Sequence, residues 1–183
     1  MGRKTRVSKG KTMKPNFFVF CEGETEVTYV KFLRSIYRVP IQIIPKKSDS
    51  NISNKYIENC KRDYVTTSND KIFLMFDLDV EGMLENLQKI ANAILLVSNP
   101  SIELWFLLHY EDCKAELSSA ECIQKLKKHS ANYSKGSLTN IGKTVLYENT
   151  AIATNRAKRL PSPKNPSSTI HELIEKLNQI VQM

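Results

Sequence analysis

The sequence predicts an α/β protein built on a mostly parallel, four-stranded sheet. Four short apolar runs recur in the first part of the chain, at residues 17–21, 41–45, 72–76 and 93–97. None of them alternates as a half-exposed strand does, and continuous apolar runs are typical of strands covered on both faces. Segments with helical periodicity separate the runs. The pattern therefore indicates a parallel sheet that is flanked by crossover helices.

The segments between the runs carry apolar residues at intervals of mostly three and four, which is the spacing of an amphipathic helix. These predicted helices cover residues 25–37, 51–64 and 80–93. Polar residues at 49–53 are candidates to cap the second of them.

A further helix is expected directly after the fourth run. Asn99 is placed to cap it, and Pro100 to occupy its first position, where a missing backbone N–H costs nothing. Near the end of the chain, Thr169 and Glu172 have the spacing of a capping box at the start of a final helix.

A chain of 183 residues is long enough for one well-packed core and short for two. We expect a flexible basic arm at residues 1–15, an α/β core at 16–111, and a helical, basic extension packed on that core at 112–183. Within the extension, helical periodicity covers residues 119–130 and 140–160.

The net charge of +8 is distributed unevenly along the chain. Residues 1–14 carry six Lys or Arg and no acid, and residues 112–164 carry ten basic and four acidic residues. Residues 15–111 carry ten basic and thirteen acidic residues. An acidic core with basic flanks favours a polyanionic partner such as nucleic acid, because neutralising phosphates releases counterions. Solubility is the other explanation of the charge.

The composition also disfavours several classes of protein. The apolar runs are too short for a membrane span or a signal peptide, so we expect a cytoplasmic protein with no membrane partner. The four cysteines form no C-x-x-C pair and the three histidines are dispersed, which disfavours disulfides and a zinc site. The oligomeric state is left open.

Three acidic residues follow strands of the predicted sheet. Glu22 comes directly after the first run, and Asp77 and Asp79 follow the third. In open α/β sheets the ligand site lies beyond the carboxyl ends of the strands, and residues two apart on an extended backbone point the same way. Clustered carboxylates repel unless a cation lies among them, and Mg²⁺ or Mn²⁺ prefers such oxygen ligands. The pattern predicts metal-assisted phosphoryl chemistry, with solubility of strand ends as the alternative.

The residues after Glu22 have separate interpretations. Gly23 permits a sharp turn or a close approach of phosphate to the backbone. Glu24 is interpreted as a first-turn acid that the helix dipole favours. Glu26 lies one turn after Glu22, and it is left open between a ligand of the same site and a helix acid.

Four segments together resemble the RloB-like proteins, a bacterial family found with restriction and phage-defence genes: FCEGETEVTYVKFL, FDLD, SNPSIELWFLLHY and YSKG. A strand ending in E-G-x-T-E, followed by a strand ending in D-x-D, is also similar to the Toprim domain of topoisomerases, primases and nucleases. The resemblance runs from about residue 16 to the C-terminus, and S-N-P-x-x-E-x-W-x-x-x-H is its most specific part.

The resemblance implies a Toprim-like, Rossmann-like core in which Glu22 is the catalytic glutamate and Asp77 and Asp79 bind the metal. Topoisomerases and primases need further domains, so hydrolysis of a phosphodiester is the economical expectation. We expect a Mg²⁺-dependent nuclease that acts on DNA or RNA in phage defence, a setting in which a partner ATPase or another defence protein fits. A non-catalytic nucleic-acid or nucleotide sensor that acts through a partner protein is the alternative, and a receiver-type phosphotransfer regulator is a more distant one.

Four residues of the segment after the fourth run are further candidates. Ser98 and Asn99 are expected at the same sheet edge, where a helix N-terminus binds phosphate through free N–H groups. Glu103 is either an extra active-site carboxylate or a helix acid favoured by the dipole. His109 is either a substrate-binding residue or a buried histidine, and Trp105 is expected in the core with its neighbouring leucines.

A loop in the basic extension supplies candidate cations for the substrate. Tyr133 and Lys135 lie in this Gly-containing loop, and Lys135 is the candidate for contacting the scissile phosphate or stabilising its developing charge. The alternative is a solvated lysine. Further phosphate contacts are expected from the basic arm and from Lys125, Lys127, Lys128, Arg156, Lys158 and Arg159.

Overall fold

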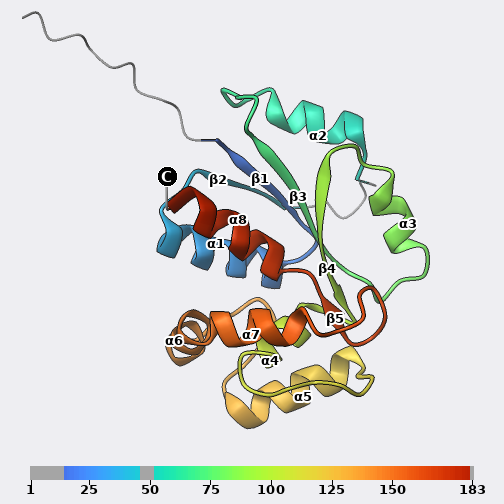
Figure 1. Cartoon of the computed structure of the whole chain (residues 1–183), viewed down its shortest axis with the longest axis vertical. Helices are drawn as coiled ribbons and strands as arrows, with labels where there is room; N and C mark the ends of the chain where they lie inside the picture. The colour runs from blue at the N-terminus through green and yellow to red at the C-terminus, as the bar shows by residue number, and fades with distance from the viewer. Residues whose placement is uncertain (1–14, 46–51, 182–183) are drawn as a thin grey trace, which may run out of the picture.

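The structure of the protein is a computed structural model that describes residues 15–45 and 52–181. Nearly all of the predicted basic arm therefore lies outside the described residues, as do the capping candidates at 49–51. Figure 1 shows a central sheet with helices on both of its faces. The predicted α/β class is confirmed.

Four of the strands are parallel. β1 (Phe17–Cys21) lies between β2 (Ile41–Pro45) and β3 (Lys71–Asp77), and β4 (Ala93–Asn99) pairs with β3 on its other side. The four apolar runs thus form the strands expected of them. β3 and β4 are slightly longer than predicted, because their polar ends still pair with the neighbouring strand.

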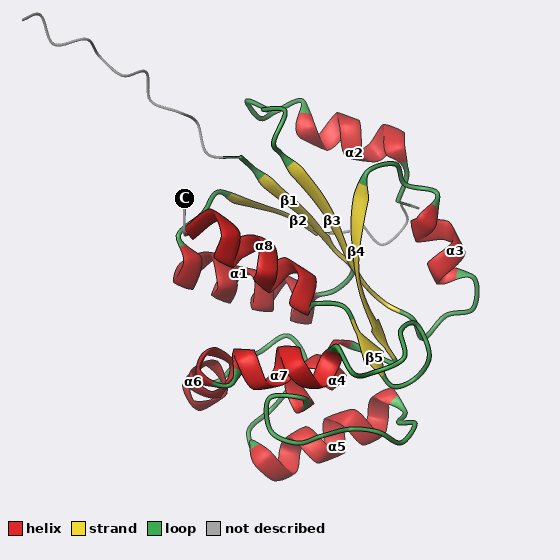
Figure 2. Cartoon of the chain, viewed as in Figure 1, coloured by secondary structure: helices red, strands yellow, loops and turns green. Residues whose placement is uncertain are grey.

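The prediction of four strands was short by one. β5 (Ser167–Ser168) pairs antiparallel with the end of β4 and completes the order β2-β1-β3-β4-β5. A strand of two residues has no periodicity to detect, and its partner lies 70 positions earlier in the chain. Figure 2 shows this short strand beside the end of β4.

The helices of the described residues largely match the predicted segments. One expected helix at 140–160 is two helices, because the chain breaks at Asn149, whose Nδ2 donates a hydrogen bond to the carbonyl of His109 at 2.9 Å. None of the described helices has the length and apolar character needed to cross a membrane. The helices are α1 (Glu24–Tyr37), α2 (Asn54–Lys61), α3 (Met83–Gln88), α4 (Ile102–Leu107), α5 (Ser119–His129), α6 (Asn140–Glu148), α7 (Thr150–Ala157) and α8 (His171–Val181).

The start of α4 was predicted too early. Asn99 does not cap the helix: it is the last residue of β4, opposite Ser167, and its Nδ2 donates to the carbonyl of Pro163 at 2.9 Å. The N-cap is Ser101, and the helix begins at Ile102. Pairing with β5 keeps the backbone extended through Asn99, which the local sequence does not reveal.

The capping box predicted at Thr169 and Glu172 was also wrong. The hydroxyl of Thr169 accepts a hydrogen bond from the N–H of Val97 at 2.9 Å and donates to the carbonyl of Leu95 at 2.7 Å. Thr169 therefore continues the pairing along the edge of β4, and α8 begins two residues later. By contrast, Ser53 caps α2, because its hydroxyl accepts from the N–H of Tyr56.

A hydrophobic cluster covers each face of the sheet. One cluster joins Phe18 of β1 to Ile57 of α2 and Leu87 of α3. The larger one packs the opposite side chains of the strands against helices that include α1, α4, α5, α7 and α8. Within it Trp105 is fully buried, and its Nε1 donates to the hydroxyl of Tyr29 at 2.8 Å. The expectation that Trp105 belongs to the core is confirmed.

Candidate functional site

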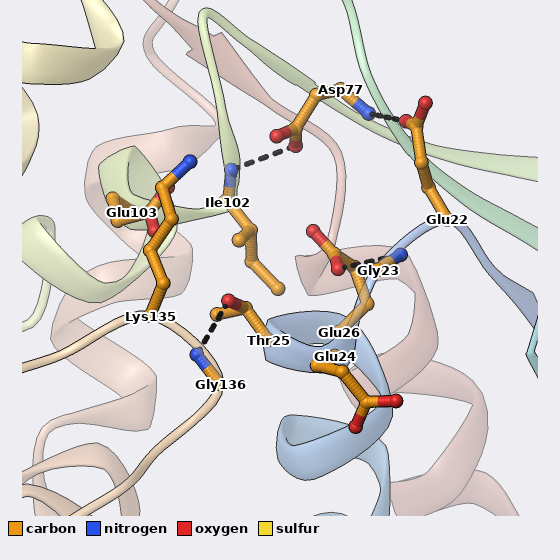
Figure 3. Close-up of a pocket in the computed structure, with 10 residues that line it drawn as sticks. All are labelled: Glu22, Gly23, Glu24, Thr25, Glu26, Asp77, Ile102, Glu103, Lys135 and Gly136. Carbon is orange, nitrogen blue, oxygen red and sulfur yellow. Dashed lines mark hydrogen bonds between the residues drawn. The ribbon is translucent and has the colours of Figure 1, made fainter. Parts of the chain in front are cut away.

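A pocket of about 270 Å³ opens at the carboxyl ends of β1 and β3. Because these strands are parallel and paired, with Cys21 opposite Met75, they end at the same edge of the sheet. The walls come from the start of α1, the end of β3, the start of α4 and the loop after α5. Figure 3 shows the lining residues: Glu22, Gly23, Glu24, Thr25, Glu26, Asp77, Ile102, Glu103, Lys135 and Gly136.

Glu22 and Asp77 meet at this edge. Glu22 directly follows β1, and Asp77 is the last residue of β3. The backbone N–H of Asp77 donates to Oε2 of Glu22 at 3.1 Å, and the N–H of Glu22 donates to the carbonyl of Met75 at 3.1 Å. Two of the three carboxylates that the sequence placed at the strand ends therefore line one pocket.

The carboxylate of Asp77 faces the start of α4. Its Oδ1 accepts a hydrogen bond from the N–H of Ile102, the first residue of that helix, at 2.9 Å (Figure 3). Burial raises the pKa of Asp77 to about 8, with the help of three nearby carboxylates. These are, in decreasing order of effect, Glu26, Glu103 and Glu22. At neutral pH the pocket therefore favours either a proton on Asp77 or a cation beside it.

Glu26, which the sequence left open, points into the pocket. It is only 4% exposed, and its Oε2 accepts a hydrogen bond from the N–H of Gly23 at 3.0 Å. Burial raises the pKa of Glu26, and the charges of Glu103 and Glu22 act in the same direction. Glu26 is thus a buried member of the carboxylate group, whereas Glu24 is exposed and its carboxylate points away from the others in Figure 3.

Gly23 leaves room for the carboxylate of Glu26 next to the backbone. A Cβ atom on residue 23 would lie 2.9 Å from Oε2 of Glu26, closer than real Cβ contacts come. The φ of Gly23 is −134°, which other residues also adopt. The close approach of a carboxylate, and not an unusual backbone conformation, therefore explains the glycine in the E-G-x-T-E stretch.

Glu103 is the most deeply buried acid of the pocket. It is 1% exposed, and both of its oxygens accept hydrogen bonds: Oε2 from the hydroxyl of Ser101 at 2.7 Å, and Oε1 from the hydroxyl of Tyr133 at 2.9 Å. Burial, followed by the charge of Glu103, raises the pKa of Tyr133, which keeps this hydroxyl protonated as the donor. The loop after α5 is thereby joined to the start of α4.

Lys135 brings the one cation among the residues that line the pocket. It is exposed, and Figure 3 shows its ammonium group on the same side of the pocket as Glu103 and Asp77. Tyr133 and Lys135 are both predicted from the sequence to bind substrate. The structure brings Lys135 to the carboxylates, while Tyr133 is buried behind them as a partner of Glu103.

Asp79, Ser98 and Asn99 lie outside the pocket lining. After Asp77 the chain continues along β4, since the N–H of Leu78 donates to the carbonyl of Ser98 at 2.8 Å, and Asp79 is exposed beyond this point. Ser98 is buried, with its hydroxyl 3.0 Å from that of Ser168. Asn99 contacts Pro163, as described above.

His109 is a buried histidine of the core. It is 1% exposed, its Nδ1 lies 2.9 Å from the carbonyl of Trp105, and its ring packs edge-on against the indole. Burial lowers the pKa of His109 to about 4, so the imidazole is neutral at physiological pH. It is not among the residues that line the pocket.

Thr25, Thr28 and Ser101 support the pocket, although the sequence pattern alone gave no reason to single them out. Thr25 and Thr28 hydrogen-bond the backbone of Gly136, and Ser101 hydrogen-bonds Glu103. Thr25 lies inside the E-G-x-T-E stretch, which was the available signal for it. Nothing in the local pattern indicates Thr28 or Ser101, because their partners are brought near only by the fold.

The donor atoms of the pocket fit a hard divalent cation. The acids that line it offer carboxylate oxygens, and no Cys or His is among the lining residues. Among the described residues, no three Asp, Glu, His or Cys side chains are arranged so that they hold a metal ion together. Mg²⁺ typically binds through about one or two protein carboxylates and completes its shell with water and substrate phosphate. Glu22 and Asp77 are the residues of the pocket that would hold such a cation.

The fold and the site define an α/β protein with a carboxylate-lined pocket at the carboxyl edge of a parallel sheet. The chain belongs to the RloB-like protein family: the model of that family matches residues 17–177. This range spans the whole sheet, both sides of the pocket and most of α8. No curated protein and no solved structure matches the chain in the comparisons made.

Proposed function

We propose that this protein is a Mg²⁺- or Mn²⁺-dependent nuclease that hydrolyses phosphodiester bonds of DNA or RNA. The observation that carries the proposal is a pocket that is lined by four acids, Glu22, Glu26, Asp77 and Glu103, and by the exposed Lys135. Clustered carboxylates suit a hard divalent cation, and a lysine beside them attracts a phosphate. Hydrolysis of a phosphodiester then needs the carboxylates, their bound cation, the lysine and a water molecule.

Glu22 and Asp77 would hold the cation. Their carboxylates reach the pocket from two paired strands, so both are positioned by the rigid part of the fold. When bound, the cation supplies Lewis-acid stabilisation of charge on the phosphate and activation of water. Asp79 is the further ligand that the Toprim resemblance implies, and its exposed position makes a separate test worthwhile.

The remaining side chains have distinct roles in this proposal. Lys135 contacts the scissile phosphate and stabilises the charge that develops on its oxygens. Glu26, whose pKa burial raises, has one oxygen bonded to Gly23, which leaves the other directed at the pocket to accept a proton from water. Glu103 is held at both oxygens by Ser101 and Tyr133 and orients the wall of the pocket.

Basic residues of the extension would contact the nucleic acid outside the pocket. Lys127 and Lys128 are exposed in the last turn of α5, a few residues before Lys135. Lys158 and Arg159 are exposed after α7, although Lys158 also pairs with a glutamate. Contacts of this kind read phosphate and not base sequence, so affinity should fall steeply with salt.

The Toprim-like character of the core and the biological setting are part of the same proposal. The E-G-x-T-E and D-x-D stretches, which follow paired strands, support the Toprim likeness. Membership of the RloB-like family is consistent with the expected role in phage defence beside a partner ATPase or another defence protein.

Cleavage assays test the proposal. Purified protein would be incubated with end-labelled single-stranded DNA, duplex DNA, single-stranded RNA and transfer RNA, with Mg²⁺, Mn²⁺ or EDTA. We expect metal-dependent cleavage of at least one substrate. Asp77→Asn should reduce the rate by more than about 100-fold, since outer-shell changes alone cost about 10–100-fold. Glu85→Gln, an exposed acid on α3, is the matched control and should retain the wild-type rate.

Two results would point away from a nuclease. Cleavage that persists in Asp77→Asn would indicate a contaminating enzyme. Nucleic-acid binding without cleavage, unchanged by Asp77→Asn, would favour the sensor that acts through a partner protein.

A further inference from the structure

The loop that carries Lys135 ends in a tight turn. The N–H of Ser137 donates to the carbonyl of Ser134 at 3.1 Å, so Lys135 and Gly136 are the two central residues of the turn. Gly136 has a φ of +76°, which the second central residue of a type II turn requires. A Cβ atom on Gly136 would lie 3.4 Å from Cβ of Glu24, so the turn packs directly on α1.

A threonine pair on α1, Thr25 and Thr28, binds both backbone polar groups of Gly136. The N–H of Gly136 donates to Oγ1 of Thr25 at 2.9 Å, and Oγ1 of Thr28 donates to the carbonyl of Gly136 at 2.9 Å. Residues three apart lie on the same face of a helix, which brings both hydroxyls to one point. The pair thereby joins α1 to a residue 111 and 108 positions further along the chain.

The other side of the turn is held by Tyr133, which is buried and donates to Glu103. Lys135 therefore lies between two positions with specific hydrogen bonds, while its own side chain is exposed at the pocket. A surface turn of small polar residues without such contacts would sample many orientations, and its lysine would lose entropy each time it met a phosphate.

We propose that Thr25 and Thr28 are positioning residues that hold the Ser134–Ser137 turn on α1 and so direct Lys135 toward a phosphate bound at the carboxylates. The role of Lys135 rests on the function proposed above, whereas the hydrogen bonds of the threonine pair do not. The E-G-x-T-E-x-T stretch then has two tasks: its acids line the pocket, and its threonines place the cation of a distant loop beside them.

Limited proteolysis tests the positioning without any catalytic assay. The Lys135–Gly136 bond is a trypsin site, and cleavage requires the turn to leave α1. We expect Thr25→Val with Thr28→Val to speed cleavage after Lys135 by on the order of fivefold for each hydrogen bond removed. Cleavage after Arg62, which is exposed beyond α2, serves as the internal reference. The same rate ratio in wild type and the double valine variant would overturn the proposal.

Matched variants separate the hydroxyl from the shape of the side chain. Thr25→Ser with Thr28→Ser keeps both hydroxyls and should restore protection to the wild-type level. Thr154→Val makes the same change on α7, away from the turn, and should leave the rate ratio unchanged. If the valine variant is unfolded by circular dichroism, each threonine would be changed singly, and each single variant should show about half of the effect on a logarithmic scale.

A double-mutant cycle then tests the role in the reaction. On the best oligonucleotide substrate, the double valine variant should lower kcat/KM, and Lys135→Ala should lower it by on the order of 100-fold. Adding the valine changes to Lys135→Ala should cause less than about a twofold further loss, because both act through the same ammonium group. Losses that multiply would contradict the proposal. A wild-type protein that cleaves nothing would refute the nuclease function, and the trypsin ratio would still decide whether the pair holds the turn.

Discussion

The backbone N–H of Asp77 lies 3.1 Å from Oε2 of Glu22, and this hydrogen bond joins the end of β3 to the turn after β1 across 55 positions of sequence. It holds the Glu22 side chain at the edge where both strands end. Glu22→Gln keeps an oxygen for this contact and removes the charge. We expect it to lower the cleavage rate by more than about 100-fold, because the charge that would bind the cation of the proposed nuclease is lost.

The neighbouring Glu24→Gln is the control for that change. Glu24 is exposed, and its carboxylate points away from the other acids (Figure 3). The cleavage rate of Glu24→Gln, measured on the same labelled oligonucleotide, should stay within about twofold of the wild-type rate. Equal losses in the two variants would show that the direction of the carboxylate does not matter.

Asp79 tests the D-x-D interpretation. It is exposed two residues beyond β3 and outside the pocket lining. A position in the outer shell would make Asp79→Asn about tenfold slower, with a weaker apparent affinity for Mg²⁺, whereas Asp77→Asn loses far more. Rates measured over a Mg²⁺ titration check this. A loss in Asp79→Asn as large as that in Asp77→Asn would make both aspartates direct ligands.

Asp77 should make the metal-free protein less stable as the pH rises. Its pKa is about 8 in the folded protein, and it is about 3.9 in an unfolded chain. Between these values the folded state binds the extra proton, so the stabilisation is complete below about pH 4 and is lost as the pH rises through about 8. Asp77→Asn removes this contribution, so its melting temperature should exceed that of wild type at pH 8, and the difference should shrink at pH 5.

Thermal melts in EDTA, followed by circular dichroism, measure this difference. Each kcal/mol corresponds to roughly 2–4 °C for a chain of this size. Glu26, whose pKa burial also raises, keeps part of the pH dependence in the variant. A gap between variant and wild type that is the same at both pH values would argue against a raised pKa at Asp77.

Gly23→Ala should destabilise the turn after β1. The added Cβ would lie 2.9 Å from Oε2 of Glu26, so the carboxylate must move and lose its hydrogen bond from the N–H of residue 23. We expect a loss of about 1 kcal/mol in the free energy of unfolding, measured with urea, which is the worth of one hydrogen bond. In a Glu26→Ala background the clash is absent, so the cost of Gly23→Ala should be clearly smaller. Equal costs in both backgrounds would exclude the contact as the cause.

Tyr133→Phe should weaken the attachment of the loop after α5. Tyr133 is 7% exposed and its hydroxyl donates to Glu103, so the change leaves one buried carboxylate oxygen without this donor. Roughly 1–3 kcal/mol of unfolding free energy should be lost. Tyr147→Phe, at a side chain that is 62% exposed, is the comparison and should change stability by less than about 0.5 kcal/mol. Similar values for both tyrosines would contradict a structural role for the bond to Glu103.

Much of the fold could be predicted because most strands and helices follow from the hydrophobic pattern of neighbouring residues. The runs at 17–21 and 72–76 are continuous and apolar, and they form adjacent parallel strands as expected. Since parallel strands end at one edge, the meeting of Glu22 and Asp77 followed from the sequence. The start of α4 was missed because Asn99 pairs with Ser167. Ser167 belongs to the two-residue strand β5, which lies far along the chain and is too short to show a periodic pattern.

The candidate site shows the same division. Acidic residues at strand ends, and a lysine in a glycine-containing loop, are visible along the chain as types and spacings. The directions of their side chains are not visible. Glu26 faces the pocket, where its carboxylate accepts a hydrogen bond from the N–H of Gly23. Asp79 lies beyond the pocket, because the preceding Leu78 hydrogen-bonds Ser98 of β4.

The amino-acid sequence therefore settles which segments form the four parallel strands and most of the helices, and that Glu22 and Asp77 meet at the carboxyl edge of the sheet. Periodicity depends on neighbouring residues, and parallel strands end at one edge. Packing in three dimensions settles which acids are buried together and that Thr25 and Thr28 bind Gly136. Those contacts join residues more than 100 positions apart. They exist only after both hydrophobic clusters have brought the helices onto the sheet, so no local pattern encodes them.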